Sequence, residues 1–221
     1  MLTVHHLNNS RSQRVLWLLE ELETPYEIKH YQRDPATMLA PPELKAVHPL
    51  GKSPVITVDG VVLAETGAIV DYIVARYGGG RLIPPANTPE RLAWTYWLHF
   101  AEGSAMPPLL LKLVFSALPA RAPGLLRGLV KSIAGRAQAG FVDPQLRTLF
   151  DYLEQVLTRT EWFAGPEFTA ADIMMSFPLE AAADRAGALE GRPHLAAFLQ
   201  KIHARPAYRR ALEKGGPYAY A

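Results

Sequence analysis

The sequence contains no cysteine among its 221 residues. This absence excludes disulfide bonds, cysteine-ligated zinc and iron–sulfur clusters. It also excludes every covalent mechanism in which a protein thiol is the nucleophile. If the protein carries out sulfur chemistry, the sulfur must therefore come from a substrate.

The chain also lacks a large surplus of charge and a long apolar run. Its 23 lysines and arginines face 21 aspartates and glutamates, a formal net charge of +2, which argues little for a nucleic-acid partner. We find no run of about 18 apolar residues and no start typical of a signal peptide. The seven histidines show no metal-ligand spacing such as H-E-x-x-H. We therefore expect a soluble cytoplasmic protein with no metal, nucleic-acid or membrane partner.

The first 80 residues alternate strand-like runs with helical periods. Apolar runs predict four strands, at 2–7, 25–30, 54–58 and 61–63. Apolar spacing predicts helices at 15–22, 43–47 and 66–77. Asp59-Gly60 is a dipeptide that suits a type I′ turn between the last two strands. The predicted order is βαβαββα.

A proline-rich linker at 81–88 separates this first domain, residues 1–80, from residues 89–221. Helical periods replace the two-residue alternation beyond the linker, so we expect an all-helical second domain and the α+β fold class.

Proline and capping signals place three helix ends in the second domain. The helix from Pro89 should stop at Pro107-Pro108, because proline lacks the amide N–H that a helix needs. Asp143-Pro144 predicts a helix start with an N-cap and a first-turn proline. Thr169 and Asp172 form a capping-box variant before another helix. A last apolar stripe runs over 195–202.

Ser10 is placed where the first strand gives way to the first helix. The segment Ser10-Arg11-Ser12-Gln13 fits the S-x-x-Q capping box, which is the ordinary structural interpretation. A helix start also exposes unpaired amide N–H groups that favour an anion. The two roles are compatible, since a capping hydroxyl accepts with its oxygen and keeps its proton for a ligand such as a thiolate.

Glu65-Thr66 and Pro54 carry a second possible site. Amides at the start of the helix at Thr66 can hold a carboxylate, while the Glu65 side chain binds an ammonium group. The alternative is an ordinary threonine cap. Pro54 requires a strand start, a sheet edge or a cis bond, and a cis bond would let the backbone of Val55 pair with a peptide ligand.

Four motifs in this order resemble the cytosolic glutathione transferases. They are Ser10-x-x-x-Arg14, His48-Pro49-Leu50-Gly51-Lys52-Ser53-Pro54-Val55, Glu65-Thr66 and Phe168-Thr169-Ala170-Ala171-Asp172. The resemblance covers nearly the whole chain. It implies a thioredoxin-like domain followed by a helical domain, usually in a homodimer, with glutathione as co-substrate and a role in detoxification.

The resemblance implies a role for each matching residue. Ser10 would hydrogen-bond the glutathione thiolate as the catalytic residue, and Val55 after a cis Pro54 would pair with the cysteinyl part. The other predicted glutathione contacts are Glu65 and Thr66 at the γ-glutamyl group and Lys52 and His48 near the glycyl carboxylate. Asn9 is a rival to Ser10, because some bacterial relatives orient the thiol with asparagine.

The resemblance also implies a second substrate and a second subunit. Phe100 and Met106, with Asn8 opposite them, would line the electrophile pocket. Glu102 or Ser104 would reach the partner subunit's site. The predicted activity is conjugation of glutathione to small hydrophobic electrophiles; the same thiolate could instead reduce disulfides or peroxides, or the chain could be a non-catalytic interaction module.

Residues 119–140 are longer than the usual connection in this family. They place cations among apolar side chains, at Arg121, Leu125, Leu126, Arg127, Leu129, Lys131, Ile133 and Arg136. We interpret them as a solvated amphipathic face, and a partner or membrane surface is the alternative.

Overall fold

The structure, a computed structural model, describes residues 1–220 and contains one mixed four-stranded sheet. The strands are β1 (Leu2–Leu7), β2 (Glu27–Tyr31), β3 (Val55–Val58) and β4 (Val61–Ala64). Their spatial order is β2-β1-β3-β4, with β1 parallel to β2 and antiparallel to β3. Asp59 and Gly60 have φ values of +50° and +80°, as the predicted type I′ turn requires.

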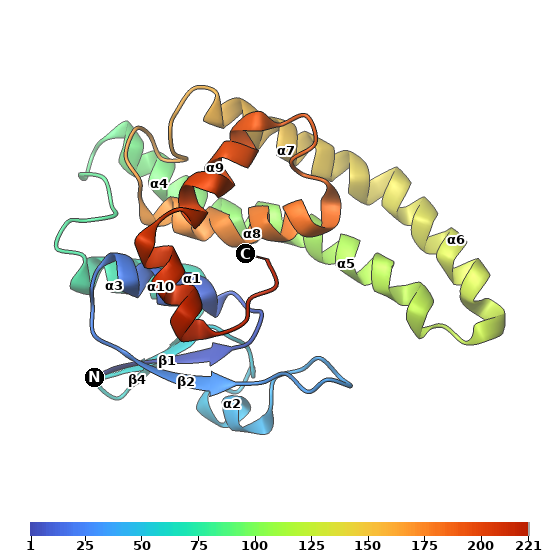
Figure 1. Ribbon diagram of the computed structural model, residues 1–221, viewed down its shortest axis with the longest axis horizontal. Coiled ribbons are helices and arrows are strands. Elements are labelled where there is room, and N and C mark those ends of the chain that lie inside the picture. Colours follow the sequence, from blue (N-terminus) through green and yellow to red (C-terminus); the bar gives the residue numbers. More distant parts are fainter. Residues whose placement is uncertain (221) are drawn as a thin grey trace.

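Helices cover both faces of this sheet (Figure 1). The first domain has α1 (Ser12–Glu21), α2 (Pro42–Val47) and α3 (Thr66–Tyr77). Helix α2 lies on the face opposite α1 and α3, which face the second domain. The predicted thioredoxin-like order βαβαββα is confirmed.

The second domain is helical throughout its described residues, as predicted. Its α-helices are α4 (Pro89–Phe100), α5 (Met106–Arg121), α6 (Arg127–Ala137), α7 (Asp143–Leu157), α8 (Ala170–Ala186), α9 (Pro193–His203) and α10 (Pro206–Gly215). One continuous hydrophobic core joins both domains, with Leu16 and Ile56 from the first and Met174 and Leu195 from the second. The domain boundaries themselves remain predictions.

Two predicted helix boundaries are wrong for the same reason. At Pro107-Pro108 the helix continues through a π-helical turn, η1 (Ala101–Ala105), into α5. Asp143 is no N-cap, because a second π-turn, η3 (Gln138–Val142), joins α6 to α7. The Met106 and Asp143 amides donate to carbonyls five residues back. We infer that this wider turn accommodates the following prolines without ending the helix.

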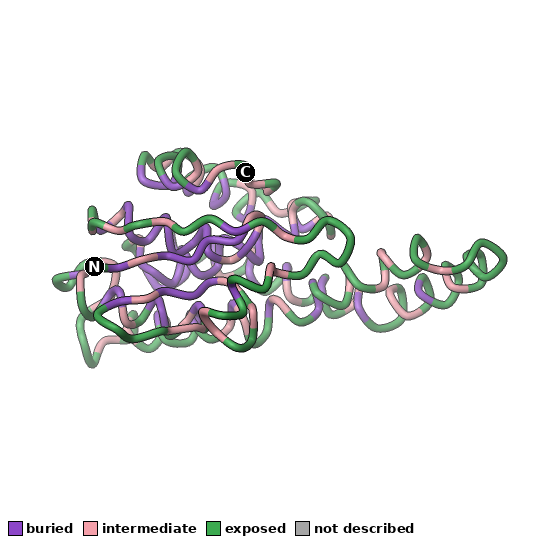
Figure 2. The backbone as a smooth tube through the Cα atoms, turned by 90° about the horizontal axis from the view of Figure 1, so that it is seen from below, coloured by how far each residue is buried: buried purple, intermediate pink, exposed green. Residues whose placement is uncertain are grey.

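The two continuous helices form a long hairpin that projects from the body (Figures 1 and 2). A short 3-10 turn, η2 (Gly124–Leu126), joins its arms, so the predicted connection at 119–140 is largely helical. The helix over Pro89–Arg121 is long and apolar enough to cross a bilayer, with a mean hydropathy of 1.3 in its most apolar window. However, Trp94 and Trp97 of its first half are buried in the second domain.

The capping box at the start of α8 is confirmed. Both carboxylate oxygens of Asp172 are used: one accepts from the amide of Phe163 at 2.8 Å, and the other from the amide of Thr169 at 2.8 Å. The Thr169 hydroxyl accepts from the Ala171 amide at 3.3 Å. Asp172 thus ties the preceding loop to the start of a helix that is buried over most of its length.

We expect Asp172→Ala to lower the free energy of unfolding by about 3 kcal/mol, because two buried amides lose their acceptors. Chemical denaturation monitored by circular dichroism measures this. Asp184→Ala on the same helix is the matched control, since Asp184 is exposed and should change stability by less than about 0.5 kcal/mol. Equal losses in the two variants would contradict the capping role.

Candidate active site

A cavity opens where α1 and α3 begin, next to the sheet edge that faces η1. Its lining residues are Arg11, His48, Leu50, Lys52, Ser53, Pro54, Ala64, Glu65, Thr66 and Glu102. Four of the predicted glutathione contacts, His48, Lys52, Glu65 and Thr66, therefore meet around one hollow. The imidazole Nδ1 of His48 is buried and has no partner within residues 1–220.

The start of α3 can bind an anion. Glu65 occupies the N-cap position with φ of +69°, which is rare for a residue with a side chain, and it makes no capping hydrogen bond. Thr66 is therefore the first helical residue and not the cap. The first amides of α3 receive no side-chain cap, so they are available to an incoming carboxylate.

The Ser53–Pro54 peptide bond is cis, as the proline pattern suggested. Pro54 lines the cavity, whereas the Val55 side chain is buried in β3 and does not. Val55 lies opposite His5 on β1 and Ala64 on β4. The predicted contact between Val55 and glutathione uses the Val55 backbone. Val55 is the first residue of β3 and directly follows Pro54 of the cavity lining.

Ser10 does not form the predicted S-x-x-Q capping box. Its Oγ accepts from the Ser12 amide at 3.2 Å, and both amide atoms of the Gln13 side chain are buried without a partner among the described residues. The reason is local: Arg11 already has helical angles, so Ser10 lies one residue before the N-cap and reaches only two residues ahead.

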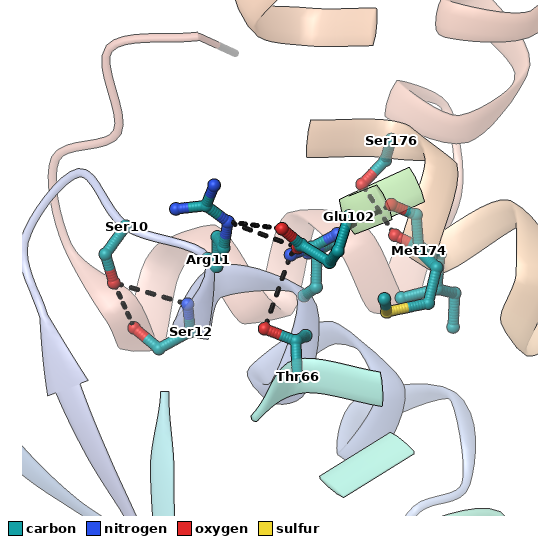
Figure 3. A network of polar contacts seen from close by, with 9 residues as sticks. Ser10, Arg11, Ser12, Thr66, Glu102, Met174 and Ser176 are labelled. Atoms are coloured by element: carbon teal, nitrogen blue, oxygen red, sulfur yellow. Dashed lines mark hydrogen bonds and ion pairs between the residues drawn. The ribbon is translucent and has the colours of Figure 1, made fainter. Parts of the chain in front are cut away.

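The Ser10 hydroxyl contacts Ser12, as Figure 3 shows, and also Ser53. It lies 2.7 Å from the Ser12 Oγ and donates to the Ser53 Oγ over 3.3 Å. The Ser12 Oγ lies 2.9 Å from Nδ1 of His6, and burial lowers the pKa of His6 to about 4, so this ring is neutral at pH 7. Ser10 is 4% exposed and lies behind the lining, which Ser53 and Arg11 provide.

Glu102 connects the cavity to the domain interface (Figure 3). It projects from η1 and accepts from Nε of Arg11 at 3.0 and 3.1 Å, and it also pairs with Arg14. Arg14 is fully buried and donates to the Met174 carbonyl at 2.7 Å. Burial would raise the pKa of Glu102, but the two arginines hold it below its ordinary value.

A second cavity lies on the other side of Arg11. Its apolar lining comes mainly from α5 and α8, with Met106, Leu109, Leu110, Leu113 and Phe177. Asn8, Asn9 and Arg33 form its polar side, so Asn8 and Met106 do lie together as predicted. Arg11 contributes to the lining of both cavities.

Two predicted residues lie elsewhere. Phe100 and Ser104 line a separate crevice between α4 and α7 together with Tyr96 and Tyr152. Phe100 and Met106 lie on either side of the π-turn η1 and line different cavities. Asn9 lines the second cavity, and its Oδ1 accepts from the Ala219 amide at 2.9 Å.

The structure adds site residues that the sequence analysis missed. Arg11 joins the two cavities, and Arg33 and Phe177 line the second. Ala219 and Tyr220 line the second cavity as well. Next to them, the Tyr218 hydroxyl donates to Glu180 at 2.6 Å. Arg11 was within reach of sequence reasoning, since it follows Ser10 in the same turn. The other residues come from distant segments and give no local signal.

Comparisons with known proteins match both domains. The model of the glutathione S-transferase N-terminal domain matches residues 1–75, and that of the C-terminal domain matches residues 118–206. The chain belongs to the glutathione S-transferase family. Glutathione S-transferase 3 of Schizosaccharomyces pombe is 36% identical, over 97% of this chain and 88% of the relative. Glutathione S-transferase 1 of Saccharomyces cerevisiae is 31% identical, over 97% and 95%.

Solved glutathione S-transferase structures share the fold. One from Actinobacillus pleuropneumoniae has a TM-score of 0.79 and 32% identity, and covers 100% of this chain and 95% of that one. Within residues 1–220 we find no group of three or more histidine, aspartate or glutamate side chains placed to hold a metal ion.

We expect Glu102→Gln to lower the free energy of unfolding by about 3 kcal/mol, because Arg14 stays buried without a counter-ion. The lowered pKa of Glu102 adds a pH dependence. In the unsubstituted chain its contribution is present above the unfolded pKa of about 4.5 and is lost as the pH falls through the lower folded pKa. The free energy of unfolding, measured by chemical denaturation at several pH values in this range, should therefore change less with pH in the variant than in the unsubstituted chain.

The control is Glu161→Gln, which removes an exposed pair with Lys201 and should cost less than about 1 kcal/mol. If Glu102→Gln costs no more than this control, the buried pair does not hold the two domains together.

Proposed function

We propose that the protein binds glutathione in the first cavity and conjugates its thiolate to small hydrophobic electrophiles held in the second. The observation that carries the proposal is the meeting of the two cavities at Arg11, beside Ser10 and the cis Ser53–Pro54 bond. One cavity is lined by charged groups and an uncapped helix start, and the other largely by apolar side chains. This pairing suits a charged tripeptide and an apolar second substrate.

Glutathione fits the first cavity group by group. The γ-glutamyl carboxylate would accept from the first amides of α3 and its ammonium would pair with Glu65. The Lys52 ammonium and the unpartnered Nδ1 of His48 suit the glycyl carboxylate. The backbone of Val55 would pair with the cysteinyl part, which directs the sulfur toward Ser10.

Ser10 would stabilise the thiolate by donating its hydroxyl proton. That proton now points to Ser53 over 3.3 Å, the longest of the Ser10 contacts, so turning it to a thiolate sacrifices a weak bond. The gain is modest. A free thiol with a pKa of about 8.5 is roughly 3% ionised at pH 7, and a fall of about 2 units gives roughly 75%.

A thiolate of lower basicity is also a weaker nucleophile. With a Brønsted slope of about 0.4 to 0.5, this loss divides the gain in thiolate concentration by about 6 to 10. The net advantage is only a few-fold. Larger rate enhancements must come from holding the electrophile against the sulfur and from stabilising charge that develops on it. The guanidinium of Arg11, which lines both cavities, is suited to that second task.

We further propose a cytoplasmic homodimer. The crevice containing Phe100 and Ser104 between α4 and α7 is an apolar surface that a second subunit could cover. Glu102 lines its own subunit's cavity, where two arginines hold it; a contribution to the partner's site stays a prediction for both Glu102 and Ser104.

We expect Ser10→Ala to raise the apparent pKa of bound glutathione by about 2 units and to lower conjugation of an activated aryl halide about 2.5- to fourfold at pH 7. The pH–rate profile of single-turnover conjugation measures both, and calorimetry should show that glutathione still binds. Ser132→Ala on α6 is the control. An unchanged profile would transfer the role to Asn9 or to the helix amides.

We expect Glu65→Ala to weaken glutathione binding about tenfold, because the ligand ammonium loses its charged partner. Titration calorimetry with glutathione measures the dissociation constant. Glu27→Ala at the opposite sheet edge is the control for the loss of one negative charge. Equal affinities for the two variants would remove Glu65 from the binding site.

A further inference from the structure

The projecting hairpin exposes far more apolar surface than a solvated arm needs. From Leu110 to the end of α6 nearly all its side chains are exposed or partly exposed; Ala134 is the buried exception. At its far end, which we call the hairpin tip (residues 118–129), Leu125 is fully exposed and Leu126 and Leu129 are at least half exposed. Exposed apolar surface of this extent is typical of an interaction site.

The projecting part of the hairpin, residues 103–142, carries charge of one sign only. No aspartate or glutamate occurs between Gly103 and Val142. Five cations do, at Lys112, Arg121, Arg127, Lys131 and Arg136. Lys112 pairs with Asp143 at the base of the hairpin, and the other four make no ion pair within residues 1–220. The rest of the chain must therefore be slightly acidic, since the whole carries only +2.

Apolar and cationic groups alternate at the hairpin tip. Arg121 ends α5, Leu125 and Leu126 form the connecting turn, and Arg127 begins α6. All four are exposed, and the views in Figures 1 and 2 agree that this turn is the part of the molecule farthest from the sheet. The tip can therefore contact a large flat surface before any other element does.

We propose that the hairpin tip docks on a membrane surface that contains anionic lipid. Leu125 and Leu126 enter the boundary between headgroups and acyl chains, while Arg121 and Arg127 bind lipid phosphates. Leucine side chains without nearby carboxylates suit this boundary, and arginine forks match phosphate oxygens.

Two other occupants fit less well. A second copy of the chain would bring one cationic tip against another if the tips met, and like charges oppose that contact. A fully inserted helix is ruled out by its first half, which contains buried Trp94 and Trp97 and the ion-paired Glu102. Shallow docking of the tip satisfies both the leucines and the arginines.

Vesicle sedimentation tests the proposal with the full chain. The protein should bind vesicles that mix phosphatidylcholine with phosphatidylglycerol and should not bind phosphatidylcholine alone. Arg121→Glu/Arg127→Glu and Leu125→Ser/Leu126→Ser should each weaken binding to the anionic vesicles about tenfold or more. All four residues are exposed, so circular dichroism and melting should stay unchanged.

The matched controls are Arg76→Glu/Arg159→Glu and Leu92→Ser, which alter exposed residues away from the hairpin tip and should bind like the unsubstituted chain. Absence of binding to anionic vesicles would overturn the proposal, as would an equal loss in the controls. A tip variant that changes the sedimentation coefficient but not vesicle binding would identify a protein contact instead.

A fluorescent reporter separates docking of the tip from docking of another face. The four native tryptophans, Trp17, Trp94, Trp97 and Trp162, are all buried in the body. Leu125→Trp places a fifth on the tip, and its emission should shift to shorter wavelength when anionic vesicles are added. Binding without this shift would place the contact elsewhere and overturn the proposal.

Discussion

The buried guanidinium of Arg14 is the constraint on which the two-domain arrangement depends. It extends from α1 to the Met174 carbonyl on α8, to Thr66 at the start of α3 and to Glu102 on η1. A buried cation is costly unless an anion pairs with it, so α8, α3 and η1 must keep their positions around the two Nη groups of Arg14. Its Nε is buried without a partner among the described residues. Because Glu102 also holds Arg11, the same ion pair positions the residue shared by the two cavities.

The π-turn that carries Glu102 also determines the shape of the second domain. By accommodating Pro107 and Pro108, η1 lets the helix continue into α5. A matching turn, η3, precedes Pro144 and extends the returning helix. The hairpin thus requires two local irregularities at its base, one of which presents a side chain to the candidate active site. π-turns commonly coincide with functional residues, and η1 carries Glu102, which lines the first cavity.

Local signals in the sequence predicted local structure well. The Asp59-Gly60 turn and the box at Thr169 and Asp172 depend on neighbouring residues and are found as predicted. For Pro54 the local pattern left a strand start, a sheet edge or a cis bond open, and the structure has the cis bond that the family resemblance implied. The prolines failed because the rule that they end helices assumes i to i−4 bonding, which a π-turn avoids. The prediction that Phe100 shares a pocket with Met106 was wrong because their relative positions around the helix were not considered. The cavity wall formed by Ala219 and Tyr220 depends on the path of the chain after α10, which no short sequence pattern encodes.

This wall has a consequence for substrate choice. Ala219 and Tyr220 line the second cavity, and they follow α10, which packs on α1, where Glu20 pairs with Arg210 and Lys214. The size of the molecules that fit the second cavity therefore depends on the distant contact between α1 and α10. Substitutions that loosen this contact would relax discrimination against bulky compounds before they unfold the protein, so selectivity can drift without any change inside the cavity.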